Sequence, residues 1–337
     1  MPRVSLRLIS ALAMAVVLAA CGSTATPQPG DAGGSAPTAD GVFPVRVEHK
    51  YGVTEIKSQP QRVVTLGLSD QDVALAVGVK PVGVVDWFKE RPFGKWPWTQ
   101  PLWGTTPPEI VGERDEYNLE KIAKLRPDLI IAQYSGMKKE QYDTLSQIGV
   151  PVVAQSGKFA DYAATWQEMT RNLAKALGKG ATGEKLITDI GERFAKVRKE
   201  NPAFATKTAI VADTFEPGNY AAFAAHDPKA AFLTESGFKM PQKIVDVPKA
   251  ENIISIGSEG LDLLDVDLLL WLSEDEVASQ RVRDEPLYRK LKVAQEKRDL
   301  FVPYNEPPIG AAISFNTVLS IPYAIDKLVP MLAGKVK

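Results

Sequence analysis

Residues 118–134 read NLEKIAKLRPDLIIAQY, a short amphipathic helix that leads directly into a buried strand. Asn118 is a good N-cap, and apolar residues follow it at the spacing of one helix face. Pro127 ends the helix because proline lacks the N–H group that a helix needs. The apolar run from Leu129 to Ile131 is typical of a strand buried on both faces. A helix that runs straight into such a strand indicates an α/β protein.

The same pattern recurs later in the chain. Residues 257–273 read GSEGLDLLDVDLLLWLS and align with the first stretch, without a gap, at a constant offset of 139. The alignment places Glu120 on Glu259 and Asp128 on Asp267. We therefore predict two equivalent α/β lobes, each with a carboxylate in the first turn of a helix that leads into a buried strand.

The chain around the first stretch supplies the rest of the first lobe. Strands are predicted at 62–66 and 81–85, where the sequence is apolar and rich in valine. Between them Ser69 is expected to cap a helix, with Asp72 as its capping-box partner. Residues 149–153 are expected to form the last strand of this lobe.

A purely helical region separates the two lobes. From 160 to 200 the apolar residues fall at spacings of three and four, and Gly178 to Gly180 separates two helices. In the second lobe we predict strands at 208–212, 267–272 and 300–302 and helices at 228–236, 258–264, 287–293 and 315–332. The expected fold is two Rossmann-like α/β lobes, 44–159 and 182–337, joined by one long helix at 160–181. A single helical crossover implies a stiff hinge with modest lobe motion.

Composition and charge exclude several classes of protein. The 337 residues are 45% hydrophobic, which is far too apolar for a disordered chain. Lysine and arginine number 40 against 41 acidic residues, so no field of one sign exists to attract nucleic acid. One cysteine and two histidines leave no internal disulfide, no CxxC pair and no structural zinc finger.

The first twenty residues have the form of an export signal. Arg3 and Arg7 precede an apolar run at 8–20, which is interrupted by Ser10. This run is shorter than the roughly 20 apolar residues that cross a bilayer. We therefore predict that residues 1–20 are cleaved and are not a permanent transmembrane helix.

The residues after this signal predict a lipid-anchored tether. Residues 18–21 (LAAC) resemble a lipobox, in which the cysteine is acylated and begins the mature protein. Residues 22–41 contain thirteen Gly, Pro, Ser or Thr and no aromatic residue, so they cannot bury enough surface to fold. We expect Cys21 and the tether, at 21–43, to hold an exported protein on the outer face of the cytoplasmic membrane, with the lipid as its only membrane contact.

The sequence carries no complete enzyme motif. Ser69 follows a strand as in a nucleophile elbow, but position 71 is Gln where the motif needs Gly, so an N-cap is the better interpretation. Residues 178–183 (GKGATG) match a dinucleotide-binding pattern but lie between helices. Glu120 and Glu259 could be an acid/base pair, or could each favour a helix N-terminus. Equivalent positions on two lobes usually share one outer surface, which suits docking better than catalysis.

A bare metal ion is a weak candidate for the ligand. Several His, Asp or Glu ligands would have to converge to hold one. His49 precedes the first core strand, and His226 stands beside Asp227. We therefore predict no metal site.

Aromatic residues gather after the strand at 81–85. Ligands of open α/β sheets bind outside the carboxyl ends of strands, and this loop leaves such an end. Such rings either line a cleft or pack on their own lobe. The candidate ligand-binding residues are Trp87, Arg91, Trp96, Trp98, Trp103 and Tyr134 from the first lobe and Phe215, Tyr220, Trp271 and Tyr304 from the second. A cleft lined by aromatic and arginine side chains suits a bulky, flat or chelate-like anionic ligand.

Residues 44–337 resemble the helix-hinged class (class III) of ABC-transporter substrate-binding proteins, in particular its ferric-siderophore branch. The stretches that carry the resemblance are PQRVV at 60–64, GVKPVGV at 78–84, NLEKI at 118–122, LRPDLII at 125–131, and Ser314-Phe315 leading to YAID at 323–326. The stretch from Trp87 to Trp103 is similar to actinobacterial members of this branch.

The resemblance implies roles for single residues. In similar proteins the acids at the Glu120 and Glu259 positions pair with arginines on the two permease subunits. Arg114, in the VGER stretch at 111–114, corresponds to an arginine that contacts the chelate in hydroxamate-binding members. Tyr134 is the nearest match to an aromatic ligand contact.

The resemblance also implies partners. It predicts a monomeric, non-enzymatic lipoprotein that binds a ferric siderophore and delivers it to an ABC permease. It implies no cofactor and no protein metal ligands, because the iron arrives already chelated. Haem and cobalamin are the alternative cargoes. An enzyme with a metallocluster on a related scaffold would need clustered cysteines, which the chain lacks.

Overall fold

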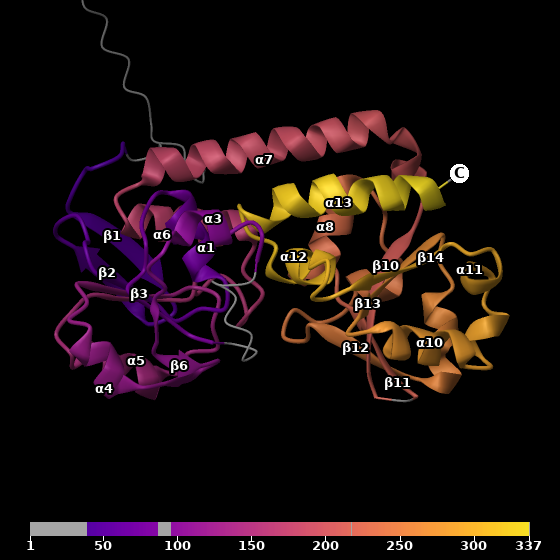
Figure 1. The fold of residues 1–337 in the computed structure, drawn as a ribbon, viewed down its shortest axis with the longest axis horizontal. Coiled ribbons are helices and arrows are strands. Elements are labelled where there is room, and N and C mark those ends of the chain that lie inside the picture. Colours follow the sequence, from indigo (N-terminus) through magenta and orange to yellow (C-terminus); the bar gives the residue numbers. More distant parts are fainter. Residues whose placement is uncertain (1–38, 87–95, 217, 337) are drawn as a thin grey trace, which may run out of the picture. The chain divides into compact units, whose positions relative to one another are not determined.

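The computed structural model describes residues 39–86, 96–216 and 218–336. The predictions for the export signal, Cys21, Trp87 and Arg91 lie outside these residues. Two five-stranded sheets organise the described chain, and we call each sheet with its helices a lobe (Figure 1). The prediction of two α/β lobes is therefore confirmed.

The sheet of the first lobe has the order β5-β4-β3-β8-β9, and every neighbouring pair is parallel. Its strands are β3 Val63–Thr65, β4 Gly83–Val84, β5 Glu109–Ile110, β8 Leu129–Ala132 and β9 Val152–Ala154. The helices of this lobe are α1 Asp70–Ala76, α3 Gln100–Trp103, α4 Leu119–Lys124 and α5 Lys139–Ser146. Two antiparallel hairpins flank the sheet: β1 Val45–His49 with β2 Gly52–Ile56, and β6 Gly112–Glu113 with β7 Glu116–Tyr117.

The sheet of the second lobe is mixed, with the order β12-β11-β10-β13-β14. Its strands are β10 Ala209–Glu216, β11 Asn219–Phe223, β12 Ile253–Gly257, β13 Leu268–Ser273 and β14 Asp299–Pro303. Strands β10, β13 and β14 are parallel, whereas β11 runs antiparallel to both of its neighbours. Its helices are α8 Pro228–Ser236, α9 Gln242–Val245, η2 Ser258–Leu264, α10 Glu276–Asp284, η3 Tyr288–Lys290, α11 Lys292–Gln295, α12 Ile309–Phe315 and α13 Ser320–Lys335.

Hydrogen bonds confirm the repeat detected in the sequence. Asp128 accepts from the backbone N–H groups of Gln61 and Arg62 at 2.7 and 2.9 Å, just before β3. Asp267 accepts from the backbone N–H group of Thr208 at 2.8 Å, just before β10. Each aspartate thus ties the start of its own strand to the start of the parallel strand beside it.

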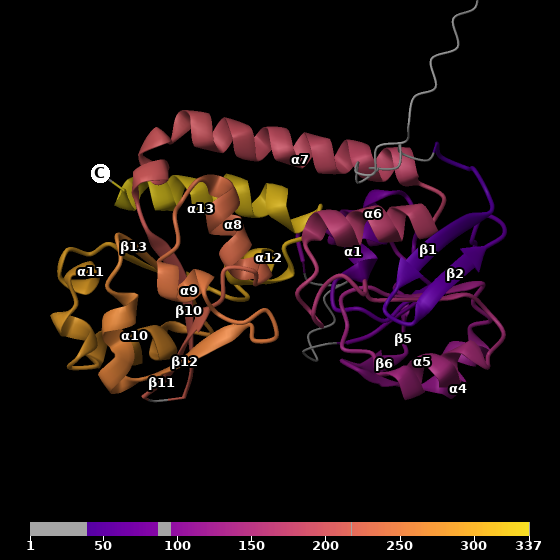
Figure 2. The ribbon, with the colours of Figure 1, turned by 180° about the vertical axis from the view of Figure 1, so that it is seen from behind.

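The helical region differs from the prediction in where the long helix lies. Helix α6, Trp166–Ala176, packs on α1 and β1 and so belongs to the first lobe. The long helix is α7, Gly180–Glu200, which contacts α6, α8 and α13 (Figures 1 and 2). A short 3-10 helix, η1 Pro202–Thr206, then leads into β10. The predicted connection at 160–181 therefore ends where the connecting helix begins.

Several predicted helices of the second lobe have another form. The one at 258–264 is a 3-10 helix, and the one at 287–293 is divided between η3 and α11. The terminal helix predicted at 315–332 is α13, which begins later, at Ser320; the preceding α12 ends at Phe315 because Asn316 adopts a left-handed φ of 46° that a continuous helix cannot contain. Within the described ranges, no helix combines the length and the apolarity needed to cross a bilayer.

Candidate ligand-binding site

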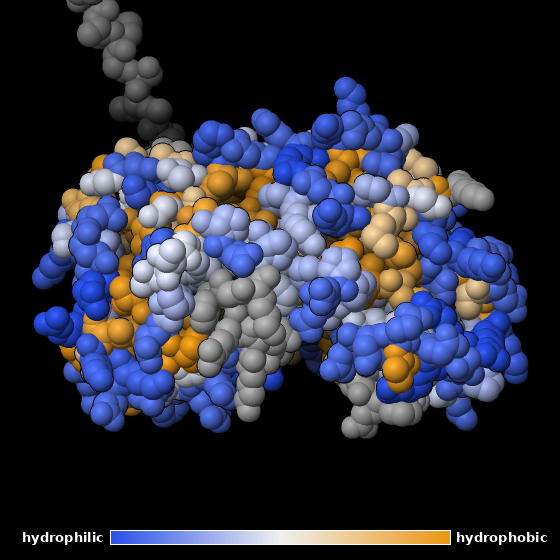
Figure 3. All heavy atoms as spheres, in the orientation of Figure 1, coloured by the Kyte–Doolittle hydropathy of each residue, from blue (hydrophilic) through white to orange (hydrophobic). Residues whose placement is uncertain are grey.

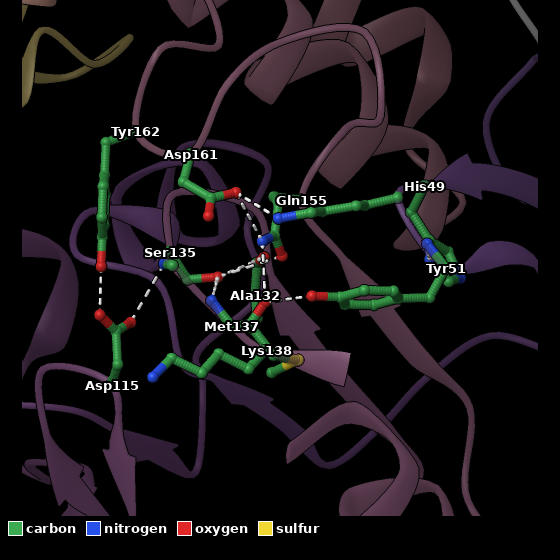
Figure 4. A network of polar contacts seen from close by, with 12 residues as sticks. His49, Tyr51, Asp115, Ala132, Ser135, Met137, Lys138, Gln155, Asp161 and Tyr162 are labelled. Atoms are coloured by element: carbon green, nitrogen blue, oxygen red, sulfur yellow. Dashed lines mark hydrogen bonds and ion pairs between the residues drawn. The ribbon is translucent and has the colours of Figure 1, made fainter. Parts of the chain in front are cut away.

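Polar side chains of the first lobe gather where strands β8 and β9 end. Gln155 follows β9, and its Nε2 donates to Met137 O at 3.0 Å and to Asp161 Oδ1 at 3.1 Å. Lys50 Nζ donates to the same Asp161 oxygen at 2.8 Å, and Ser135 Oγ donates to the last carbonyl of β8 at 3.0 Å (Figure 4). Because ligands of such sheets bind beyond the carboxyl ends of strands, this edge is the candidate site.

Asp70 fixes the backbone at this edge. Its carboxylate accepts the N–H groups of Gln133 at 2.7 Å and Tyr134 at 3.0 Å, and that of Gly67 as well. A Cβ atom at Gly67 would lie 2.4 Å from this carboxylate, so the close approach requires glycine. Burial is the larger effect on Asp70 and raises its pKa to about 6.

Tyr134 lies where the two lobes meet. Its ring packs edge-on against Tyr162, with the ring centroids 5.7 Å apart. Its side chain is buried. Burial first, and then the charges of Asp227 and of the neighbouring Tyr304 and Tyr162, raise the pKa of Tyr134 well above its ordinary value. Asp227 and Tyr304 belong to the second lobe, so residues of both lobes lie within electrostatic range of Tyr134.

Arg114 and Tyr162 share an unusual backbone conformation beside Tyr134. Arg114 is at the tip of the β6–β7 hairpin with φ 45°, and Tyr162 has φ 62°. Asp115 joins them, because it accepts from the Tyr162 hydroxyl and from the Gly136 N–H group at 3.1 Å (Figure 4). Left-handed backbone at non-glycine residues costs about 1–3 kcal/mol and clusters at ligand clamps. The exposed Arg114 is thus presented by a strained, well-supported turn.

The second lobe contributes Tyr304 and an ion pair. Tyr304 follows β14 and is half-buried. Asp227 caps α8 by accepting the Lys229 N–H group at 2.9 Å, and it also pairs with Lys229 Nζ at 3.0 Å. The same ammonium group lies 4.2 Å from the centroid of the Phe223 ring. In the space-filling view the lower margin of the surface is notched between the lobes (Figure 3).

Two tryptophans of the predicted aromatic loop pack between elements and do not line an open surface. Trp96 and Trp98 stack on each other with centroids 5.3 Å apart. Trp96 meets Phe315 of α12 edge-on at 5.5 Å, and Trp98 lies 5.3 Å from the Tyr323 ring of α13. Both tryptophan side chains are buried. The prediction that they line the cleft is therefore not met in this structure, because their rings pack against Phe315 of α12 and Tyr323 of α13.

Trp103 is also a core residue. It packs with Leu75 and Val84 in a small cluster of the first lobe and is 3% exposed. It therefore offers a ligand almost no surface. Trp87 and Arg91, predicted from the same loop, lie outside the described residues, so their placement stays a prediction.

Trp271 and Tyr220 are corrected in the same way. Trp271 has no exposed surface, and its Nε1 donates to the Tyr288 hydroxyl at 3.0 Å. Tyr220 packs edge-on against Trp271. Phe301 stacks on Trp271 as well, with the ring centroids 6.0 Å apart. Both residues belong to the core of the second lobe, on the sheet face covered by η2, η3 and α11. The side chain of Phe215 lies outside what the structure describes.

The predicted capping box at the start of α1 is wrong. Ser69 makes no side-chain capping hydrogen bond. Asp72 is instead buried and accepts from Trp98 Nε1 at 3.1 Å and from Thr317 Oγ1 at 2.6 Å. Burial raises the pKa of Asp72 to about 7. Thr317 lies between α12 and α13, so Asp72 ties the first lobe to the C-terminal helices.

The two acids of the repeat are both on the surface. Glu120 lies in the first turn of α4 and Glu259 in the first turn of η2, and both are exposed. The predicted N-cap of α4 is confirmed, because the Asn118 side chain accepts from the Lys121 N–H group at 2.9 Å. A docking role for the two glutamates stays a prediction.

Other concave or polar places lie apart from this edge. A cavity of about 470 Å³ opens beside the amino end of β14, lined by Arg283, Tyr288, Lys297 and Lys335 among others. Within the part of the chain that the structure describes, no three His, Cys, Asp or Glu side chains are grouped closely enough to hold a metal ion.

Three residues of the candidate site were missed by sequence reasoning. Asp70 carried a signal, because an acid directly after a strand–turn sequence is well placed to accept backbone N–H groups. Asp227 precedes Pro228, which is the usual place for a helix N-cap. Tyr162 carried no signal, because its partner Asp115 is far away in the sequence.

The chain belongs to the family of periplasmic binding proteins, whose model matches residues 63–302. This family consists of substrate-binding proteins. The fold agrees with it, since two α/β lobes of this kind are what its helix-hinged members share.

Three known proteins illustrate the similarity. A periplasmic solute-binding protein from Mycobacterium smegmatis is 33% identical over 87% of this chain and 99% of its own, with a TM-score of 0.77. PiaA of Streptococcus pneumoniae, solved in complex with ferrichrome, is 26% identical over 87% of this chain and 98% of its own, with a TM-score of 0.73. YhfQ of Bacillus subtilis, a putative ABC transporter substrate-binding lipoprotein, is 32% identical over 62% of this chain; the match spans 60% of YhfQ.

Proposed function

We propose that this protein is the extracytoplasmic substrate-binding lipoprotein of an ABC importer, and that it captures a ferric siderophore between its lobes. The observation that supports the proposal is that the half-buried Tyr162 and Tyr304 and the exposed Arg114 come from the ligand edges of both lobes, around the buried Tyr134, which Tyr162 packs against and which Tyr304 and Asp227 influence electrostatically. The ferrichrome complex of the similar pneumococcal protein supports iron chelates as the cargo.

The chemistry of this edge suits a chelate better than a bare ion. The half-buried rings of Tyr162 and Tyr304 and the exposed Arg114 offer flat apolar contact, hydroxyl hydrogen bonds and a positive charge. Iron held by its own chelator needs no further ligands from the protein. The protein binds and releases the chelate without making or breaking a covalent bond, and needs no cofactor for this.

Delivery requires a surface that the permease recognises. Glu120 and Glu259 are exposed at equivalent places of the two lobes. We propose that each pairs with a basic group on one of two permease subunits. Cys21 carries the lipid that keeps the protein at the membrane, as in lipoproteins such as the similar YhfQ.

A fluorescence titration tests the proposed cargo. Trp166 Nε1 donates to Glu235 of α8 at 3.0 Å, and Trp98 contacts α13, so two tryptophans report on the contact between the lobes. Ferric hydroxamate, catecholate and carboxylate chelates should change the emission of the purified full chain, and at least one should do so with a saturable curve. Haem and cobalamin are the comparison arms. A response to either of these alone, with none to any ferric chelate, would refute the siderophore proposal.

A further inference from the structure

The ligand edge of the second lobe is acidic. Strand β10 carries Asp213 just after its parallel pairing with β13 ends at Ala212, Glu274 directly follows β13, and Glu306 lies just beyond β14. Asp227 adds a fourth carboxylate at the start of α8. Among the described residues of β10, of the stretches directly after β13 and β14, and of the start of α8, Lys229 is the single lysine and there is no arginine.

The one lysine does not neutralise this group. Its ammonium is already paired with Asp227 at 3.0 Å, and both side chains are largely buried, at 17% and 6% exposed. The Phe223 ring, 4.2 Å away, stabilises the same ammonium group further. The charges of Asp213 and Glu274 therefore remain in excess.

The carboxylates act on one another and on the site. The pKa of Asp213 is raised to about 6, mainly by burial. The charge of Glu274 also raises this pKa, whereas the charge of Lys229 lowers it. Asp227 is close enough to Tyr134 to raise the pKa of that phenol. The acidic edge is thus electrostatically connected to the tyrosines that face it across the lobes.

We propose that this edge selects for charge, so that the site prefers a ferric chelate that carries a protonated amine over a neutral or polycarboxylate chelate. This inference rests on the proposed function and narrows its substrate class. A cationic group directed at the second lobe gains from Asp213 and Glu274, whereas carboxylates placed there would be repelled. Asp213 is half-buried, so solvent screens its interactions less than those of the exposed Glu274.

A matched pair of ligands tests the preference. The purified full chain is titrated with a linear ferric trihydroxamate that has a free amine, with the same chelate after acetylation of the amine, and with ferric citrate. We expect the cationic form to bind about tenfold or more tightly than the acetylated form, which corresponds to about 1.4 kcal/mol. Ferric citrate should bind most weakly, and the advantage of the amine should shrink at high salt.

Two double variants separate the effect of the acidic edge on binding from the effect of the protein's total net charge. Asp213→Asn with Glu274→Gln is nearly isosteric and leaves the Asp227–Lys229 pair intact. It should reduce the advantage of the amine to less than about threefold. Glu200→Gln with Asp246→Asn removes the same charge from exposed positions, on α7 and directly after α9, and should retain the advantage.

The outcomes distinguish this inference from the proposed function. If the acetylated chelate or ferric citrate binds as tightly as the cationic chelate, the charge preference is refuted while capture of ferric chelates stands. If both double variants behave alike, the acidic edge does not set the preference. If no ferric chelate binds at all, the proposed function fails as well.

Discussion

At the residue scale, two acids in the first turn of α1 have different partners. Asp70 holds the backbone of the candidate site, whereas Asp72 reaches Thr317 in the connection between α12 and α13. Their spacing made a local capping box plausible for Asp72. The partner that binds it lies 245 residues away, so no local pattern could have predicted it.

Asp72 makes stability depend on pH. Its pKa is about 7 in the folded chain against an ordinary value of 3.8, so the native state binds the extra proton between these values. Stability should therefore fall as pH rises from about 4 to about 7, by up to a few kcal/mol. Asp72→Asn should flatten this slope in urea unfolding measured at several pH values.

A second variant separates titration from lost hydrogen bonds. Asp72→Ala leaves the Trp98 indole N–H and the Thr317 hydroxyl buried without their acceptor, and should cost about 1–3 kcal/mol at every pH. If Asp72→Asn kept the full slope of the unaltered protein, the assignment of that slope to Asp72 would be wrong.

Arg114 offers a test of the ligand contact. Arg114→Ala should weaken binding of a ferric chelate about tenfold, because an exposed guanidinium at the ligand edge is lost. Arg126→Ala is the matched control, since Arg126 is also exposed in the first lobe and also has a left-handed backbone, with φ 47°. Calorimetric affinities that fell equally in both variants would speak against a direct contact.

At the scale of elements, α6 and α7 approach each other through glycine. A Cβ atom at Gly183 would lie 2.5 Å from the Ala174 Cβ atom, whereas one at Gly191 of the same helix would meet nothing within 4 Å. Gly183→Ala should destabilise the protein by about 1–3 kcal/mol through overpacking. Gly191→Ala should stabilise it by up to about 1 kcal/mol through helix propensity.

Thermal unfolding of the two alanine variants decides between packing and propensity. Opposite shifts of Tm are expected. Shifts of the same sign would mean that close packing between α6 and α7 at Gly183 does not determine the stability of the protein.

Elements with clear local signals were predictable from the sequence. The helix at 228–236 was found with its exact bounds, because an acid and a proline mark its start and a glycine its end. The central strands β3, β8, β10 and β13 were found from their apolar runs. Strands β11 and β12 were missed, because they pair antiparallel in a lobe where the helix–strand pattern indicated parallel strands only.

The candidate site was harder to predict, because aromatic residues serve both cores and ligands. Tyr134 and Tyr304 were predicted from their positions just after strands, and their contact with a ligand stays a prediction. Trp96 and Trp98 looked equally suited to a ligand, but the loop places them against α12 and α13. Whether a ring faces a ligand or a neighbouring helix depends on tertiary contacts that a single sequence does not contain.

At the scale of the whole molecule, contacts besides α7 join the lobes. Asp72 binds Thr317, and Glu235 of α8 accepts from Trp166 and from Gln167 of α6. Burial raises the pKa of Glu235. These contacts link α1 and α6 of the first lobe to α8 and to the connection between α12 and α13, whereas the modest lobe motion predicted from the single long helix stays a prediction.

The proposed docking to a permease involves one glutamate from each lobe, so it is tested with both residues changed together. The double variant Glu120→Ala with Glu259→Ala should abolish uptake of the chelate by cells and leave its affinity unchanged, because both acids are exposed, on α4 and η2, and neither is among the residues of the candidate site. Glu140→Ala with Glu200→Ala removes two other exposed acids and should leave uptake normal. Normal uptake by the first double variant would exclude the glutamates from docking.

Native mass spectrometry of the purified chain with a ferric chelate tests the central claim most directly. The account predicts one adduct per chain whose mass equals the intact ferric chelate, with both iron and chelator released unchanged on denaturation. An adduct of iron alone, a chemically altered chelator, or no adduct with any ferric chelate would contradict it.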